Sequence, residues 1–248
     1  LSFLIILFKV LKNERVRNIT NEYLLPKFLF FKNIFFQSMP ISVSICGYAL
    51  AAAIIFTYVG QSGEYAVAGY GVGTRIEQVV LLPILGINTA IISIIAQNYG
   101  ANNLVRIKET YFTAIKYAFI IMITAGTLVF LSASVITSFF SSDPEVIEYG
   151  KRYLKISAFV LPAYPVFFLS NGFFMALKKS ENAMISNFFR NILNPIAVFY
   201  IAKYINASFE TFFWLWVGIN WFFSISYFFI IIYYFKLKLN KSSAVVQP

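Results

Sequence analysis

Histidine is absent from this chain, and cysteine and charged residues are scarce. The 248 residues include no His and one Cys, and only 12% are charged, against about a quarter in soluble domains. The missing histidine excludes His-based metal sites and His acid–base pairs, and a single cysteine excludes an intrachain disulfide. No cluster of acid, His or Ser–Lys groups lies within an apolar segment, as a membrane-embedded enzyme would need. The sequence therefore indicates a protein that is not an enzyme and carries no cofactor.

Acidic residues are half as common as basic ones, which gives a net charge of +10. In a soluble protein that excess would favour a nucleic-acid partner. Here the Lys and Arg residues stand between apolar runs and do not line one face, so nucleic acid is not expected as a partner. Hydrophobic residues make up 59% of the chain and aromatic residues 19%, and membrane lipid is the partner that covers so much apolar surface.

Six apolar segments dominate what is present, and each is long enough to cross a bilayer as a helix. They lie at approximately 36–59, 79–96, 110–140, 144–177, 183–205 and 209–235. Short polar or turn-prone stretches separate them, such as Ser141-Ser142-Asp143-Pro144, which is a typical start of a helix. The sequence predicts an all-α membrane protein with a bundle of six transmembrane helices over residues 36–235.

The segments outside this bundle are interpreted from their length and charge. Residues 1–8 are apolar but too short to span, and no basic region precedes them as in a signal peptide. We expect them to be the end of a truncated transmembrane helix, and the chain to be a fragment of a longer protein. Residues 9–35 are a basic cytoplasmic or interfacial linker, either a helix beside anionic lipid or a solvated loop. Residues 236–248 form a basic cytoplasmic tail.

The distribution of basic residues predicts the orientation. Connections at 9–32, 97–109, 178–182 and 236–248 contain thirteen Lys and Arg residues, and the alternate connections contain three. Basic loops remain in the cytoplasm, so both ends are expected there. The expected location is the plasma membrane, which is the inner membrane in a Gram-negative cell.

One stretch of the chain carries a family resemblance. Its motifs are Ala68-Gly69-Tyr70-Gly71, then Arg75, then Pro83 and Gly86, and then Ala96-Gln97-Asn98-Tyr99-Gly100-Ala101. This pattern resembles the eighth helix of the multidrug and toxin extrusion (MATE) family, in the second of its two six-helix lobes. The resemblance implies the C-terminal lobe of a twelve-helix antiporter. Such a protein exports drugs or small organic cations by alternating access, with sodium or a proton as coupling ion and the missing N-terminal lobe as its partner.

Glu77 is the only carboxylate close to a predicted membrane interior. It lies eleven residues before Asn88, about three helical turns, so both side chains share a face. Tyr70 and Gly73 are expected on the same face. Ionisable groups at membrane depth are costly and often mark ion pathways. Glu77 and Asn88 are therefore the candidate site for ion or proton coupling. The alternative is that Glu77 is an ordinary interfacial charge beside Arg75, or that coupling rests on a carboxylate in the missing lobe.

Further polar residues are candidates for lining a substrate cleft: Tyr48, Tyr70, Asn171, Asn191 and Asn194. Hydrogen bonds between helices are the simpler explanation for the asparagines. Arg190 lies among them, and the same two explanations, a hydrogen bond to another helix or contact with substrate, apply to it. Extension of its side chain to lipid headgroups would also explain it. Tyr48 stands about where some branches of the family carry an acidic residue for cation binding, so the resemblance does not extend to that acid.

Candidate hinges are the residues that weaken helices: Pro83, Gly86, Pro162, Pro165 and Pro195. A proline removes an amide donor and frees a carbonyl, and broken backbone within a membrane usually faces a cavity or another helix. Plain kinking for packing is the alternative. The spacing Gly69-x-Gly71-x-Gly73 is not that of a nucleotide-binding loop, and close contact between helices or a flexible helix entry explains it better.

Two other functions remain open at this point. A lipid-linked oligosaccharide flippase has a related fold, but such proteins tend to place several basic residues in the cleft, and these spans have few. A non-functional half-transporter would also fit, because the sequence does not show that a first lobe exists.

Overall fold

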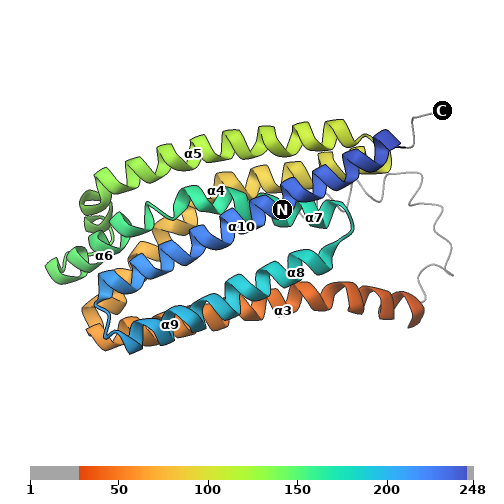
Figure 1. The fold of residues 1–248 in the computed structure, drawn as a ribbon. Coiled ribbons are helices and arrows are strands. Elements are labelled where there is room, and N and C mark those ends of the chain that lie inside the picture. The colour runs from red at the N-terminus through yellow and green to blue at the C-terminus, as the bar shows by residue number, and fades with distance from the viewer. Residues whose placement is uncertain (1–27, 245–248) are drawn as a thin grey trace, which may run out of the picture. The chain divides into compact units, whose positions relative to one another are not determined.

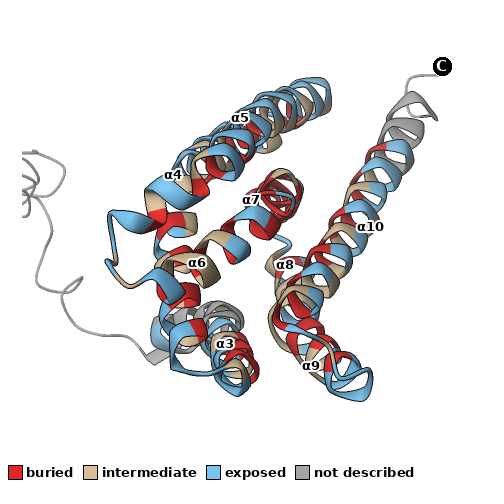
Figure 2. Ribbon diagram, turned by 90° about the vertical axis from the view of Figure 1, so that its left-hand side faces the viewer, coloured by how far each residue is buried: buried red, intermediate tan, exposed pale blue. Residues whose placement is uncertain are grey.

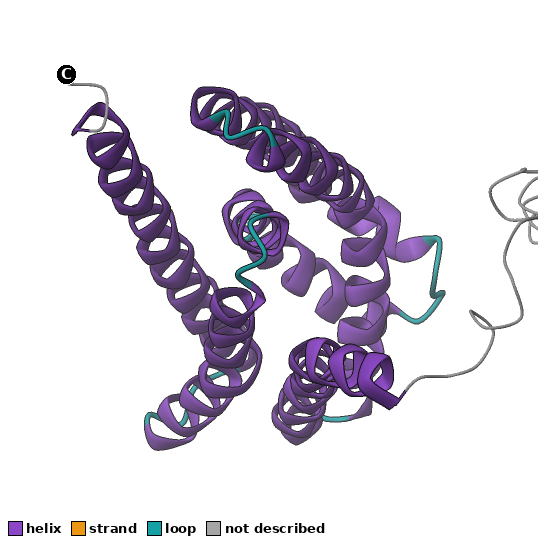
Figure 3. Cartoon of the chain, turned by 90° about the vertical axis from the view of Figure 1, so that its right-hand side faces the viewer, coloured by secondary structure: helices purple, strands orange, loops and turns teal. Residues whose placement is uncertain are grey.

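The computed structural model describes residues 28–244, and within this range the chain is helical with no strand (Figures 1 and 3). In chain order the elements are α3 (Phe28–Val59), the 3-10 turn η2 (Gly60–Ser62), α4 (Glu64–Gly100), α5 (Leu104–Ser138), α6 (Pro144–Ser157), the 3-10 turn η3 (Leu161–Ala163), α7 (Tyr164–Ala176), α8 (Ser180–Phe188), the π-helical segment η4 (Phe189–Leu193), α9 (Asn194–Tyr204) and α10 (Phe209–Ala244).

The chain divides into two compact units, Leu1–Ser42 and Val43–Pro248. Helix α3 begins in the first unit and ends in the second, so part of the predicted linker at 9–35 is helical. The predicted truncated helix at 1–8 and the rest of that linker up to residue 27 lie outside the described residues, as does the end of the predicted tail. The part of that tail up to Ala244 continues α10.

Side-chain caps explain where two of the helices begin. The Asn103 side chain accepts a hydrogen bond from the backbone amide of Arg106 at the start of α5. The Asp143 side chain accepts from the amides of Glu145 and Val146 at the start of α6. Such caps satisfy amides that have no partner within the helix. The helix start predicted at Asp143 and Pro144 is therefore confirmed.

Helix α7 lies at the centre of the second unit. Of the apolar window in the span Pro144–Ala176, 72% is buried, against 17–28% in the spans that include α4, α5 and α10. Figure 2 shows α7 mostly in the colour of buried residues, whereas α5 and α10 each expose one face. Helices α4, α5 and α10 all contact α7. A helix enclosed in this way is apolar on all sides because no face of it meets lipid or water.

Prolines break two of the predicted spans but not a third. Pro162 lies in η3 and Pro165 in the first turn of α7, so the fourth span is divided into α6 and α7. Pro195 lies in the first turn of α9, directly after the π-helical segment. Pro83, by contrast, lies inside α4, which runs through it without a break. At Pro83 the helix therefore continues, and its role as a hinge stays a prediction.

Four described helical stretches are long and apolar enough to cross a membrane: Glu64–Gly100, Leu104–Ser138, Pro144–Ala176 and Phe209–Lys236. The apolar part of α3 described here, Cys46–Ser62, is shorter. The predicted fifth span is divided into α8, η4 and α9, none of which is long enough alone. A transmembrane, all-helical fold is thus supported, and the number of six spans stays a prediction.

Candidate functional site

The carboxylate of Glu77 on α4 is held by two tyrosines. Tyr153 of α6 donates its hydroxyl hydrogen to one carboxylate oxygen, and Tyr164 of α7 donates to the other at 2.5 Å. The glutamate is half-buried, and both tyrosines are buried. A carboxylate removed from water is stable only when such donors or a counter-charge replace the lost hydration. Helices α4, α6 and α7 therefore meet around one charged group.

Two glycines of α4 allow the close approach that this arrangement needs. A β-carbon on Gly73 would overlap the ring of Tyr153, and one on Gly69 would lie 2.7 Å from the backbone nitrogen of Gly150 in α6. At Gly71 a β-carbon would meet nothing within 4 Å. The predicted close helix contact is therefore confirmed for Gly69 and Gly73, and Gly71 has no part in it.

Arg190 lies on the π-helical segment η4 and is surrounded by aromatic rings. Its guanidinium carbon lies 4.0 Å from the ring centroid of Phe167, 4.9 Å from that of Tyr164 and 5.5 Å from that of Phe168. Its Nε donates to the Oδ1 of Asn220 on α10 at 3.2 Å. Ring faces attract cations, most strongly where water is excluded. Rings and an amide thus hold this charge in place, without a direct ion pair to any carboxylate in the described part of the chain.

Glu77 and Arg190 line the same small pocket, whose volume is about 120 Å³. Tyr164 contacts both charges, because its hydroxyl donates to Glu77 and its ring faces Arg190. The volume is below the roughly 300–1,000 Å³ of drug-sized sites. A pocket of this size and composition can accept a small cation or water beside the carboxylate.

Three of the predicted cleft residues come together here. Tyr48 of α3, Tyr70 of α4 and Asn191 of η4 line the pocket with Glu77. Tyr70 is buried and packs edge-on against Tyr153 at a centroid distance of 5.0 Å. The helical face that the sequence assigned to Tyr70 and Glu77 is thus observed, whereas their roles stay predictions.

The other predicted polar residues lie elsewhere. The Oδ1 of Asn88 is buried against Gly172 of α7 and has no hydrogen bond within the described residues, so Asn88 does not line the pocket of Glu77. Asn171 accepts from Tyr227 of α10 at 3.3 Å, which is a bond between helices. Asn194 is buried, and its amide has no partner in the range 28–244. The structure therefore separates Glu77 from Asn88 and places the asparagines of α7 and α9 in packing positions.

Three residues at the pocket were not among the predicted site residues. Tyr153 and Tyr164 are eleven positions apart, about three helical turns, which would have placed both on the face toward Glu77. This spacing could not be recognised from the sequence, because η3 interrupts the helix between the two tyrosines and because the chain contains sixteen tyrosines. For Arg190 the sequence left open a hydrogen bond to another helix, contact with substrate, and extension to lipid headgroups. The bond to Asn220 of α10 bears out the first, but the sequence does not show that aromatic rings enclose the guanidinium.

No group of three or more His, Cys, Asp and Glu side chains that could hold a metal ion occurs within the described residues. A dedicated metal centre is thus not seen in this part of the chain. The chemistry of the pocket rests on one carboxylate, one guanidinium and hydroxyl groups.

Comparison with known proteins identifies the fold and the family. A family model described as MatE matches residues 40–200. Among solved structures, a MATE transporter in complex with MaL6 has a TM-score of 0.80 and 20% identity, covering 95% of this chain and 53% of that one. A MOP superfamily transporter from Pyrococcus furiosus has a TM-score of 0.79 and 22% identity, covering 90% of this chain and 49% of that one. These likenesses show the fold.

Curated relatives are similar at low identity over a part of their length. A protein named FAD transporter from Shewanella oneidensis is 24% identical over 158 residues, which are 64% of this chain and 35% of that protein. The multidrug export protein MepA from Staphylococcus haemolyticus is 26% identical over 154 residues, 62% of this chain and 34% of that protein. The match thus spans about a third of these relatives and about half of the solved transporters. Because the MatE model matches more than half of the chain, this protein belongs to the MatE family of MATE transporters.

Proposed function

We propose that this chain is the C-terminal half of a cation-coupled antiporter that exports drugs or small organic cations across the plasma membrane. Its partner is an N-terminal six-helix lobe, and both ends of the chain lie in the cytoplasm. The family, the transmembrane helices and the coverage of about half of the solved transporters support this proposal. The positive charge of alternate connections supports the orientation.

The observation that carries the proposal is the Glu77 carboxylate inside the bundle. It faces a pocket of about 120 Å³ that also contains tyrosine hydroxyls and the side chain of Asn191. Sodium prefers such oxygen ligands, and a carboxylate held by hydroxyl donors can also take up a proton. We propose that Glu77 binds the coupling ion, alone or together with a carboxylate of the N-terminal lobe. Asn88 has no part in this role, because it lies outside the pocket.

Ion binding would act on the helices through Tyr164 and Arg190. When Glu77 is ionised, it attracts the guanidinium across the pocket, and a bound sodium or proton would weaken that attraction. Because Tyr164 begins α7 directly after η3, and Arg190 lies on the π-helical segment before α9, both contacts are next to breaks in helices. Pro162, Pro165 and Pro195 would be the bending points of alternating access.

The substrate class follows from the names of relatives and is part of the proposal. Relatives from Bacillus subtilis and Staphylococcus haemolyticus are named multidrug resistance or multidrug export proteins. The relative named FAD transporter favours a second candidate class, an aromatic nucleotide. We propose drugs or organic cations as the principal substrates, because two of these three names specify drugs.

The test is drug accumulation in cells that carry the full-length gene, with the sodium and proton gradients collapsed one at a time. Export should stop when one of the two gradients is removed. Glu77→Gln should abolish gradient-driven export while the protein remains in the membrane, and Glu64→Gln at the exposed start of α4 should leave export unchanged. Undiminished export by Glu77→Gln would remove the proposed role of Glu77, and export insensitive to both gradients would remove cation coupling.

A further inference from the structure

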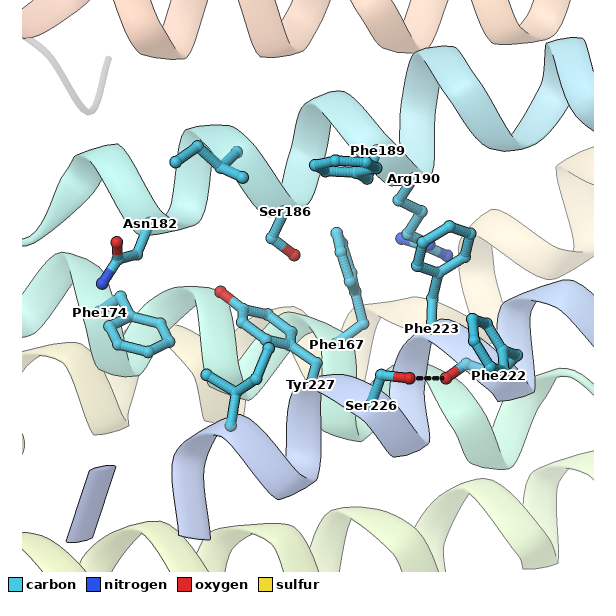
Figure 4. A pocket seen from close by; sticks show the side chains of 12 residues that line it. Phe167, Phe174, Asn182, Ser186, Phe189, Arg190, Phe222, Phe223, Ser226 and Tyr227 are labelled. Atoms are coloured by element: carbon cyan, nitrogen blue, oxygen red, sulfur yellow. Dashed lines mark hydrogen bonds between the residues drawn. The ribbon is translucent and has the colours of Figure 1, made fainter. Parts of the chain in front are cut away.

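Arg190 also lines a second and larger cavity, between α7, α8 and α10. Its volume is about 400 Å³, which is within the roughly 300–1,000 Å³ of small-molecule sites. Figure 4 shows Asn182 near one end and Arg190 near the other, with Ser186 of α8 between them. Arg190 lies eight positions after Asn182, which corresponds to about 12 Å along a helix. The cavity is therefore elongated along α8.

Half of the twelve residues that line this cavity are aromatic. They are Phe167, Phe174, Phe189, Phe222, Phe223 and Tyr227, supplied by α7, η4 and α10. The rings of Phe174 and Tyr227 are stacked at a centroid distance of 5.8 Å and an angle of 21°. Walls of this kind favour a flat aromatic guest, since rings gain from stacked and edge-to-face contacts beyond the area they bury.

Among the described residues that line the cavity, Arg190 alone is charged. No carboxylate is close enough to form an ion pair with it in the described part of the chain, and its hydrogen bond to Asn220 uses Nε. The two terminal nitrogens of a guanidinium form a planar fork that matches a carboxylate. A cation without a direct counter-ion at the end of an apolar cavity favours an anionic guest.

We propose that this cavity binds a flat aromatic monocarboxylate. Its rings lie among the phenylalanines and Tyr227, and its carboxylate pairs with Arg190. The guanidinium that pairs with this carboxylate also lines the pocket of Glu77, so Arg190 belongs to both sites. The site is complete within α7, α8, η4 and α10 of this chain, and it does not depend on the proposed coupling role of Glu77.

The binding test uses the full-length protein in lipid nanodiscs with 2-naphthoate as the probe, measured by equilibrium dialysis. The matched probe 2-naphthamide has the same rings and no charge. Naphthoate should bind at least about tenfold more tightly, as expected for hydrogen bonds to a charged partner. Equal binding of the two probes would overturn the proposal, because the cavity would then be an apolar groove without an anion site.

Two variants separate this site from non-specific binding. Arg190→Gln should reduce naphthoate affinity about tenfold or more and leave naphthamide affinity unchanged. Ser226→Phe fills the cavity from α10 without touching Arg190 and should exclude both probes. Its control is Thr124→Phe on α5, since both hydroxyls are exposed and donate to the carbonyl four residues before. Naphthoate binding that survives both Arg190→Gln and Ser226→Phe would contradict the proposal.

Native mass spectrometry of the same samples tests the competing occupant, a lipid acyl chain from the bilayer. A probe that binds in the cavity should form a one-to-one complex with the protein. A phospholipid or fatty acid that remains bound and is not displaced by naphthoate would overturn the proposal and assign the cavity to lipid.

Discussion

In the described part of the chain, charged side chains form direct ion pairs at the exposed rim of the helix bundle, near the start of α6, but not in its interior. At the exposed start of α6, Glu148 pairs directly with Lys151 at 2.9 Å and with Arg152 at 3.0 Å, and Arg152 also reaches Glu210 of α10 at 3.0 Å. Inside the bundle, Glu77 and Arg190 line one pocket and form no direct pair, and Tyr164 contacts both.

The exposed charges are thus paired with one another, whereas Glu77 and Arg190 keep atoms that face a pocket. Exposed ion pairs contribute little because water and salt screen them. A buried charge is costly, and it persists in a protein when local donors or rings satisfy it. Glu77 and Arg190 are satisfied in this way and still face open volume, which is the arrangement expected of a site that takes up an ion.

The largest expected effect comes from removing the donors of Glu77. Replacing both Tyr153 and Tyr164 by Phe keeps the rings and deletes two hydrogen bonds to a charged group. The double variant should lose about 2–5 kcal/mol of unfolding free energy, measured by denaturant titration of the purified protein in detergent. The control Tyr117→Phe on the exposed face of α5 should change little.

A double-mutant cycle sharpens this prediction. In a Glu77→Gln background the same two tyrosine changes should cost clearly less, because the partner of the hydroxyls is no longer charged. An equal cost in both backgrounds would show that the tyrosine hydroxyls act independently of Glu77.

A smaller effect is expected from the glycines that bring α4 to α6. Gly73→Ala places a methyl group against the Tyr153 ring and should cost about 1–3 kcal/mol of unfolding free energy, as overpacking usually does. Gly71→Ala is the matched control, since a β-carbon there meets nothing, and it should be neutral or stabilising by up to about 1 kcal/mol. Thermal unfolding of both variants in detergent checks the order, and equal costs would contradict the proposed close contact.

The smallest effect is expected at the rim. Arg152→Gln removes two exposed ion pairs and should change the unfolding free energy by less than about 1 kcal/mol, and still less at high salt. Lys116→Gln on α5 is the control for the loss of one surface charge. If Arg152→Gln lowered the unfolding free energy more than Gly73→Ala does under the same conditions, the exposed ion pairs would contribute more to stability than the interior contacts. That result would contradict the comparison made above.

Much of the helical architecture could be predicted from the sequence because lipid imposes a simple rule. Long apolar runs bounded by basic or turn-forming residues must be helices, and Asp143 with Pro144 marked the start of α6 correctly. Internal breaks were harder to place. Three prolines do coincide with breaks, but Pro83 does not, since the tolerance of a helix for proline depends on its neighbours.

The site was only partly predictable. Glu77 was identified because a carboxylate near a membrane interior is rare, and its face correctly included Tyr70. Asn88 does not line the pocket of Glu77. Helical periodicity predicts that two side chains point to the same side of a helix, but it does not predict which neighbouring helix packs against each of them. For Arg190 a hydrogen bond to another helix was among the explanations offered, but the sequence could not show its surroundings, since the rings around it come from α7 and its amide partner from α10.

The most direct test of the account is transport in proteoliposomes that contain the full-length protein or its Glu77→Gln variant. Two modes are compared, accumulation of a labelled organic cation driven by a sodium or proton gradient, and its exchange at equilibrium without a gradient. The account predicts that Glu77→Gln loses gradient-driven accumulation and retains exchange. Gradient-driven accumulation by Glu77→Gln at the rate of the unmodified protein would contradict it.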